Sequence, residues 1–419
     1  MLTLLIAVLA SGQGEVTGWI SRPEGFHEGY SLSRTVVLSR HNIRSPLSGG
    51  GSVLSRITDG DWFDWTSAPG ELSLRGGALE TRMGQFFRLW LISEGLMKEN
   101  EIPADGEMRF YANSMQRTIA TAQYFSSGML PVANVEVERH YLLGTMDPVF
   151  NPQLTNIDDA FREKAMGQIA AMGGEEGLKG IPLKVADGLA VIERALDMRN
   201  SPAAAGDTVR FRTDDLAIKL EESKEPAMTG GLKMATSASD ALVLQYYEEP
   251  DEWKADFSHG LTFEDWMKIS EVKDWYGDVL FTAPAVAVNV AHPLLQTLLS
   301  EMEAEGRKFT FLCGHDSNIG SVLAALQAED YYLPGSIEQR TPIGCKLVFN
   351  LWNGSDGKEY AEILLVYETP WELRTMPMLG SKSAPVAVRL SLKGMESNLD
   401  GLYALSDLED RFREAIDAY

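Results

Sequence analysis

The chain contains little cysteine and more acidic than basic residues. Its 419 residues include only two cysteines, Cys313 and Cys345, so at most one disulfide can form within the chain. Both lie in strand-like segments, and we favour two buried free thiols over a single disulfide, although spacing alone leaves both arrangements open. Lys and Arg number 37 against 60 Asp and Glu, for a formal net charge of −23. Nucleic-acid binding requires a basic surface, so this charge argues against a nucleic-acid partner.

No apolar run is long enough to span a bilayer. The run at residues 2–12 instead resembles the apolar core of a signal peptide, with small residues before a candidate cleavage point but no preceding basic residues. We therefore expect residues 1–12 to be a signal peptide and the mature protein to be periplasmic or secreted, with no membrane anchor. A buried N-terminal strand is the alternative.

Metal-binding spacings are missing as well. The sequence contains no HExxH, no paired CxxC and no EF-hand loop, and we expect neither a metal nor a cofactor. The composition, 44% apolar and 23% charged, is ordinary for a globular protein. A chain of this length can bury a large core in more than one domain.

Histidine is scarce too, but two of the six histidines follow strand-like runs. His41 belongs to RHNIRSP at residues 40–46, directly after the apolar run 35–38. Ligands of open α/β sheets bind at the carboxyl ends of the strands. Arg40 and Arg44 can each donate two N–H groups to phosphate oxygens, and the imidazole between them can attack phosphorus. A structural salt-bridge cluster is the alternative.

The second histidine repeats this arrangement near the other end of the chain. The apolar run 309–313 leads into GHDSN at residues 314–318, which contains His315 and Asp316, and a helical pattern follows. The repeat of strand, polar cluster and helix start favours an active site over a structural cluster.

A third segment brings in Arg117. The strand-like residues 109–112 precede NSMQRT, and Ser114 is a candidate helix N-cap that places Arg117 in the first helical turn. A cation is unfavourable there because of the helix dipole, so Arg117 needs a compensating anion. Bound phosphate would supply it, and a neighbouring Asp or Glu is the alternative.

These three segments together resemble the histidine acid phosphatases, a branch of the histidine phosphatase superfamily, over about residues 35–392. Further matches are GTMDP with FNP at 144–152, LQYYE at 244–248 and RTPIG at 340–344. Asn after the first histidine and Ser after the HD pair are typical of the periplasmic glucose-1-phosphatase branch. The related phytases more often have RHGxR and HDTN.

The resemblance implies a role for each matched residue. His41 is similar to the nucleophile that forms a phosphohistidine, and Asp316 to the general acid. Glu248 is similar to a helical-domain glutamate that narrows the pocket in glucose-1-phosphatases. The positions that clamp the phosphate correspond to Arg40, Arg44, Arg117 and His315.

The chemistry explains these residue types. The phosphoryl group carries charge on three equatorial oxygens in the transition state, and fixed cations stabilise it. The same cations lower the pKa of His41, so that a neutral nucleophile persists in acid. For Asp316, burial raises the pKa and the cations lower it, and the sequence leaves the balance open.

The distribution of apolar residues predicts an α/β protein with a helical insert. Strand-like and helical runs alternate up to about residue 145, including a helix around 78–97, and again from about 278. Residues 344–368 contain a hairpin. Residues 146–277 are mostly helical, without convincing strands.

We therefore expect a discontinuous catalytic domain at 13–145 and 278–419 and a helical cap domain at 146–277. The resemblance implies a three-layer α/β/α sandwich for the catalytic domain, with the phosphoglycerate-mutase-like fold.

The leading functional hypothesis is acid phosphatase activity on a small-molecule phosphomonoester, with glucose 1-phosphate or a related sugar phosphate as substrate. A phytase shares the machinery but needs a wider, more basic pocket. A phosphoglycerate-mutase-like phosphotransferase is a further alternative, and so is a binding protein with a dead site, which the complete residue set disfavours.

Overall fold

The computed structural model describes residues 19–47 and 52–419, so the predicted signal peptide lies outside the described residues. Within them, the centre is a seven-stranded mixed sheet with the order β2-β5-β1-β6-β7-β8, and β9 pairs with β7. The strands are β1 (Tyr30–Arg40), β2 (Met108–Ala112), β5 (Phe309–Gly314), β6 (Lys346–Gly354), β7 (Glu359–Tyr367), β8 (Val386–Arg389) and β9 (Tyr403–Ala404). The predicted hairpin is confirmed as β6 and β7, which pair antiparallel.

The register of the parallel strands brings the three sequence motifs together. β1 lies between β5, which is parallel to it, and β6, which is antiparallel. Arg40 pairs with Gly314, and Ala112 of β2 pairs with Cys313. The motifs that follow β1, β2 and β5 therefore leave the sheet at the same edge. β1 can form the middle of the sheet because its apolar run Val36–Leu38 is fully buried.

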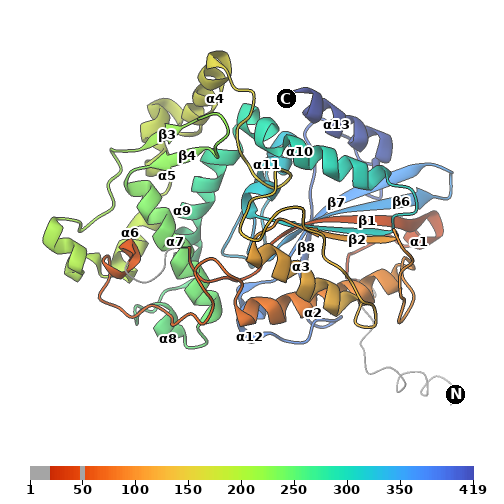
Figure 1. The fold of residues 1–419 in the computed structure, drawn as a ribbon, viewed down its shortest axis with the longest axis horizontal. Helices are drawn as coiled ribbons and strands as arrows, with labels where there is room; N and C mark the ends of the chain where they lie inside the picture. The colour runs from red at the N-terminus through yellow and green to blue at the C-terminus, as the bar shows by residue number, and fades with distance from the viewer. Residues whose placement is uncertain (1–18, 48–51) are drawn as a thin grey trace.

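Helices cover both faces of the sheet, which confirms the α/β sandwich (Figure 1). One face packs on α2 (Leu74–Ser93) and α3 (Gln116–Met129), and the other on α10 (Pro284–Glu303), α11 (Asp316–Ala325) and α13 (Leu405–Asp417). Smaller helices of this part are α1 (Phe26–Gly29) and α12 (Pro370–Thr375). The two faces bury separate apolar clusters, so the sheet is shielded on both sides.

The predicted helix at 78–97 is α2, which begins about one turn earlier than expected. Ser73 caps it, because its hydroxyl accepts the Gly76 N–H at 3.0 Å. α2 and α3 pack closely where glycines remove the side chain. A Cβ added to Gly84 would lie 2.1 Å from the carbonyl oxygen of Phe125, so this position requires glycine.

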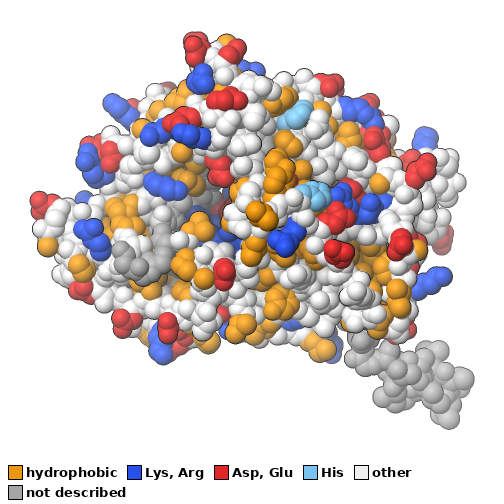
Figure 2. Space-filling model, viewed as in Figure 1, with side chains coloured by type: hydrophobic (Ala, Val, Ile, Leu, Met, Phe, Trp, Pro, Cys, Tyr) orange, Lys and Arg blue, Asp and Glu red, His pale blue; other side chains and the backbone are white. Residues whose placement is uncertain are grey.

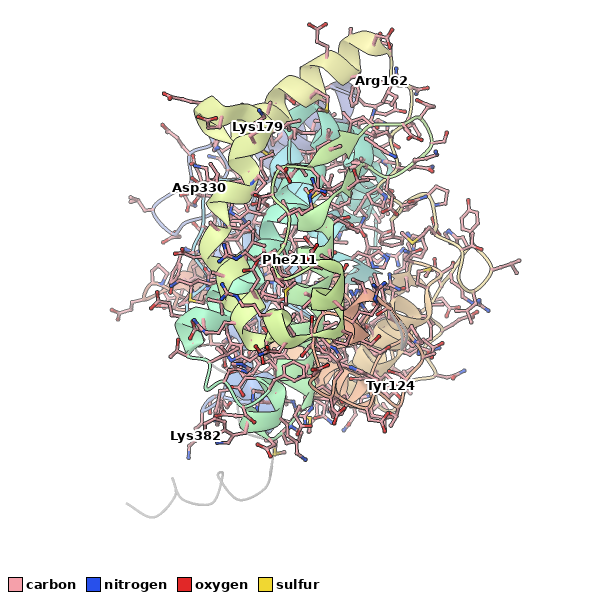
Figure 3. All side chains as sticks on the ribbon, turned by 90° about the vertical axis from the view of Figure 1, so that its left-hand side faces the viewer. Tyr124, Arg162, Lys179, Phe211, Asp330 and Lys382 are labelled. Atoms are coloured by element: carbon pink, nitrogen blue, oxygen red, sulfur yellow. The ribbon has the colours of Figure 1, made fainter. Side chains whose placement is uncertain are left out.

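The insert between β2-α3 and α10 is mostly helical, as predicted. Its helices are α4 (Asp159–Met172), α5 (Ile181–Lys184), α6 (Ala186–Ala195), α7 (Gly231–Glu248), α8 (Glu252–Ala255) and α9 (Phe263–Phe281). Figure 3 faces this part of the molecule, with Arg162 on α4. Two short strands, β3 (Ala217–Lys219) and β4 (Ala227–Thr229), form a hairpin, which corrects the expectation of no strands. The predicted boundary at 277 falls inside α9.

The two cysteines lie on opposite sides of β1. Ser39 pairs with Cys313 on one side and with Lys346, the neighbour of Cys345, on the other. Two strand spacings separate them by about 10 Å, beyond the reach of a disulfide. Both are buried free thiols, which confirms that prediction.

Membrane-spanning potential is low in individual helices. In residues 19–47 and 52–419, no single helix is long and apolar enough to cross a membrane, whereas α9 and α10 pass this test only as a pair bent by 83°.

Candidate active site

His41 is held by the backbone of β5 and of the segment just before β6. Its N–H donates to the Gly314 carbonyl at 3.1 Å, and its carbonyl accepts the Gly344 N–H at 3.1 Å. The side chain is only 3% exposed. The imidazole therefore projects from a fixed point at the end of the parallel strands.

The tautomer of His41 follows from one hydrogen bond. Nδ1 lies 2.9 Å from the carbonyl oxygen of Asn42, and a carbonyl only accepts. Nδ1 therefore carries the proton, and Nε2 keeps its lone pair. Burial lowers the pKa of His41 well below its usual value, and the charges of Arg117 and Arg44 lower it further. The ring is neutral and nucleophilic in acid.

A buried polar network behind His41 was not foreseen from the sequence. The Asn42 side chain donates to Glu80 Oε1 at 2.7 Å, and Lys346 Nζ lies 2.9 Å from the same oxygen. Lys346 also donates to the Gly344 carbonyl at 2.7 Å. Glu80 and Lys346 are fully buried, so the loop that carries His41 rests on an ion pair inside the protein.

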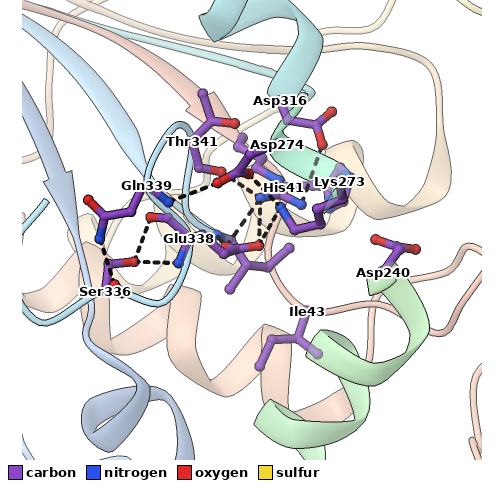
Figure 4. A network of polar contacts seen from close by, with 12 residues as sticks. His41, Ile43, Asp240, Lys273, Asp274, Asp316, Ser336, Glu338, Gln339 and Thr341 are labelled. Carbon is purple, nitrogen blue, oxygen red and sulfur yellow. Dashed lines mark hydrogen bonds and ion pairs between the residues drawn. The ribbon is translucent and has the colours of Figure 1, made fainter. Parts of the chain in front are cut away.

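Arg40 is buried beneath the site, held by ion pairs and a backbone carbonyl. Its Nη1 donates to the Thr341 carbonyl at 2.5 Å and lies 3.3 Å from Glu338 Oε1, and its Nη2 lies 3.5 Å from Asp316 Oδ2. Glu338 also accepts Lys273 Nζ of α9 at 2.8 Å. Figure 4 shows Glu338 and Lys273 in this network. The insert thus contributes a cation to the ion pairs beneath the catalytic residues.

Arg44 and Arg117 differ in their partners. Arg44 forms a two-pronged ion pair with Asp240 of α7, with contacts of 3.2 and 3.3 Å. Arg117 lies in the first turn of α3, as predicted, and its Nη1 contacts only the Gly70 carbonyl, at 3.4 Å. Among the described residues, no carboxylate forms an ion pair with Arg117, and burial together with Arg44 lowers its pKa to about 10. The alternative of a carboxylate partner for Arg117 is therefore not realised.

The expected N-cap of α3 is wrong. The helix begins at Gln116 with Met115 as its cap residue, without a side-chain cap bond. The Ser114 hydroxyl instead accepts a hydrogen bond from the Tyr141 N–H at 3.1 Å, and the Ser114 carbonyl accepts one from the Gly144 N–H at 2.7 Å. Ser114 anchors the loop that follows α3 rather than the start of the helix.

His315 faces His41, with ring centroids 5.5 Å apart. The side-chain oxygen of Asn113 accepts the Asp147 N–H at 2.9 Å. The side-chain nitrogen of Asn113 therefore points the other way and lies 2.7 Å from His315 Nε2, to which it donates. Nε2 is therefore an acceptor, and Nδ1 of His315 carries the proton. Burial lowers the pKa of His315, and so does Arg117. Asn113 is a further site residue that the sequence argument missed.

Asp316 is the first residue of α11, and its side chain is half exposed to the cavity. Burial acts to raise its pKa, but Arg40, Lys273 and the Ser317 N–H together lower the pKa below the usual value. The effect of the cations on the pKa of Asp316 therefore outweighs that of burial, a balance that the sequence left open.

A cavity of about 950 Å³ contains this cluster. It is lined by His41, Arg44, Arg117, His315 and Asp316 together with insert residues such as Glu225, Asp240 and Lys273. Glu248 does not line it. Its Oε2 accepts the Ser73 hydroxyl at 2.8 Å, about two turns along α7 from Asp240. The expectation that Glu248 narrows the phosphate pocket is therefore wrong.

The arrangement suits attack on a phosphate ester, and comparison with known proteins agrees. Residues 31–160 match the histidine phosphatase superfamily (branch 2). A glucose-1-phosphatase of Providencia rettgeri is 37% identical over 393 residues, which cover 92% of each chain. The chain belongs to the histidine acid phosphatases.

Other relatives of this histidine acid phosphatase carry two kinds of name. A glucose-1-phosphatase of Salmonella typhimurium is 36% identical over 91% of this chain and 92% of that protein. The phytase AppA of Escherichia coli is 26% identical over 92% of each. The family and the enzyme class, a phosphatase, are as predicted from the sequence.

Solved structures share the fold. The apo form of Hafnia alvei phytase has a TM-score of 0.84 at 24% identity over 93% of this chain and 98% of that one. The phytase of Citrobacter braakii has a TM-score of 0.83 at 23% identity over 92% and 98%. This likeness confirms the α/β fold with its helical insert.

Proposed function

We propose that this phosphatase hydrolyses a sugar 1-phosphate through a phosphohistidine. Nε2 of His41 attacks phosphorus, and the sugar oxygen leaves with a proton from Asp316. Water then attacks the phosphohistidine and transfers its proton to the same carboxylate, which restores the enzyme. The free lone pair of Nε2 beside three arginines is the observation that carries this proposal.

In the proposed clamp, Arg44, Arg117 and Nδ1–H of His315, which line the cavity, donate to the phosphate oxygens, and Arg40 approaches them from beneath the cavity lining. Arg117 has the least compensated charge of these groups, so a dianionic phosphate satisfies it best. Bound phosphate also opposes the effect of the cations on Asp316, and it raises the pKa of that carboxyl toward the protonated form that a general acid requires.

A sugar phosphate fits the cavity better than a polyphosphate does. Three insert carboxylates that line the cavity are paired with cations, Asp240 with Arg44, Asp274 with Lys273 and Asp278 with Arg340. Glu225 also lines it and has no ion-pair partner among the described residues, so its charge repels additional phosphates. On the face of the molecule that Figure 2 shows, side chains of both charges are interspersed, without one continuous basic patch. The relatives that are more than 30% identical are both glucose-1-phosphatases.

Phytase activity is the second candidate. The cavity volume of about 950 Å³ favours it, since this exceeds the needs of a single sugar ring. The charge of Glu225 counts against it.

For the organisation of the chain, we propose that the cap domain extends to the bend after α9, near Thr282, rather than to residue 277. We also propose export to the periplasm or medium, on the strength of the apolar N-terminal run alone. Fractionation of cells that express the full chain tests the localisation.

The substrate proposal is tested by measuring phosphate release from glucose 1-phosphate, inositol hexakisphosphate and phosphoglycerates side by side, without added metal. The highest kcat/KM on glucose 1-phosphate is expected. A higher value on inositol hexakisphosphate would establish the phytase instead, and transfer between phosphoglycerates would establish a mutase.

A further inference from the structure

The cavity continues beyond the phosphate clamp along α11. It passes Ser317 and Gly320 and reaches Ala324, about 12 Å along the helix axis from Asp316 at 1.5 Å per residue. We call the part beyond Asp316 the distal arm. Its walls include Gly277, Asp278, Thr282, Gly320, Ala324 and Arg340. Because Asp316 protonates the leaving oxygen at the start of this arm, the leaving group extends into it.

Two glycines of the distal arm have no explanation in the fold. Gly277 lies in α9 and Gly320 in α11, where glycine destabilises a helix relative to alanine. Neither has a positive φ. A Cβ at Gly277 would meet nothing within 4 Å, and one at Gly320 only Thr282 Cγ2 at 3.9 Å. Packing does not require these glycines, unlike Gly84 in α2.

The effect of both glycines is to widen the cavity. Both glycines line the cavity, and an added Cβ would have open space around it at either position, so larger side chains there would take up cavity volume. A leaving group of one sugar ring occupies only the beginning of a cavity of this volume. The glycines therefore indicate that a longer group fills the remainder.

The polar groups of the distal arm suit an uncharged ligand with many hydroxyls. The charge of Arg340 is compensated by Asp278, with Nε 2.9 Å from Oδ2, and Glu329 and Asp330 outnumber the remaining cation of this end, Lys393. A second phosphate would be repelled here. Tyr331 adds a ring with a polar end, a surface that can contact both the apolar and the hydroxylated side of a sugar.

We propose that the distal arm binds a second sugar ring, so that the preferred substrate is a phosphorylated oligosaccharide rather than a monosaccharide phosphate. This inference rests on the proposed sugar-phosphatase function and specifies its substrate class. No added chemistry is involved, since the same P–O bond breaks and the same oxygen takes the proton of Asp316.

The test compares kcat/KM for maltose 1-phosphate, glucose 1-phosphate and p-nitrophenyl phosphate in the wild type and in Gly277→Leu and Gly320→Leu. We expect maltose 1-phosphate to be the best sugar substrate. Each leucine should reduce kcat/KM for it about tenfold, as a steric block in a pocket does, with p-nitrophenyl phosphate within about twofold. Gly167→Leu in α4 is the matched control, because an added Cβ there also meets nothing within 4 Å and the site is outside the cavity.

The outcomes separate the two proposals. Hydrolysis of glucose 1-phosphate without any gain from the second ring would overturn the inference and leave the sugar-phosphatase function standing. Activity on p-nitrophenyl phosphate but on neither sugar phosphate would overturn both. Equal losses on all three substrates in the leucine variants would also overturn the inference, and activity on p-nitrophenyl phosphate shows that each variant is folded.

Discussion

Lys346 Nζ lies 2.9 Å from Glu80 Oε1, and both side chains are fully buried behind His41. Burial raises the pKa of Glu80, while Lys346 and Asn42 counteract this shift. Each of the two charges therefore depends on the other. The pair lies on α2 and β6, and through Asn42 and Gly344 it fixes the loop that carries His41.

Removing one member of this pair should be more harmful than removing both. Lys346→Met leaves a buried unpaired carboxylate and should lower the free energy of unfolding by about 3–5 kcal/mol. The double variant Glu80→Gln with Lys346→Met should recover most of that loss. Urea denaturation measures both, with Lys308→Met, at a partly exposed ion pair with Glu101, as a control that costs about 1 kcal/mol or less. A double variant as unstable as the single one would contradict the argument.

His41 is the proposed nucleophile, and we expect no other side chain to take over its role. We expect the wild type to form an acid-labile, base-stable phosphoenzyme. His41→Ala should abolish it together with turnover, because no other unprotonated nitrogen faces the clamp in the described residues. Trapping with labelled substrate at low temperature measures the intermediate. Substantial hydrolysis of an aryl phosphate by His41→Ala would show that the proposed mechanism is wrong.

Replacement of the general acid should depend on the leaving group. Asp316→Asn should slow hydrolysis of a sugar phosphate by about 10²–10⁴-fold, the usual contribution of general acid catalysis, and p-nitrophenyl phosphate much less. A sugar alkoxide needs the proton, whereas p-nitrophenolate leaves without it. Paired kcat/KM measurements give the ratio, and equal losses on both substrates would assign Asp316 to binding.

The buried histidines should make the protein less stable in acid. The pKa of His41 lies well below its value of about 6.5 in an unfolded chain, so only the unfolded state gains a proton as the pH falls below 6.5. Its contribution to stability therefore decreases with falling pH, by up to about 1.4 kcal/mol per pH unit. His41→Ala removes this contribution.

Unfolding free energies between pH 7 and pH 5 measure this effect. The slope against pH should be smaller for His41→Ala than for the wild type, and unchanged for His27→Ala, whose side chain is 59% exposed. Identical slopes for His41→Ala and the wild type would mean that the buried ring is charged in the folded protein.

Local patterns were sufficient to predict where the chemistry lies. The apolar runs before His41 and His315 form neighbouring parallel strands, and parallel strands necessarily end at one edge of the sheet. The Asn42–Glu80–Lys346 network could not be predicted in this way, because its members are 38 and 266 residues apart and meet only through packing. The role of Asn113 was missed although the residue begins the NSMQRT segment, because its contact with His315 joins positions 202 residues apart.

The error over Glu248 has a similar cause. The motif LQYYE correctly placed this residue in a helix of the insert, but a motif does not reveal which turn of a helix faces the cavity. Asp240 and Glu248 are on the same helix, and only Asp240 reaches the clamp. The prediction that Ser114 caps α3 was wrong because its hydroxyl accepts the Tyr141 N–H, which belongs to a later loop, instead of an N–H of the helix.

Glu225 therefore replaces Glu248 as the residue expected to control substrate charge. It follows β3 in the hairpin of the insert and lines the cavity, and burial together with the charge of Asp316 raises its pKa. Glu225→Gln should raise kcat/KM for inositol hexakisphosphate relative to glucose 1-phosphate by about tenfold, since removal of a like charge from a partly desolvated pocket is worth about 1 kcal/mol or more. Glu248→Gln, a carboxylate of the same insert outside the cavity, is the matched control and should leave the ratio unchanged. If Glu248→Gln changed the ratio and Glu225→Gln did not, the assignment of the two glutamates would have to be reversed.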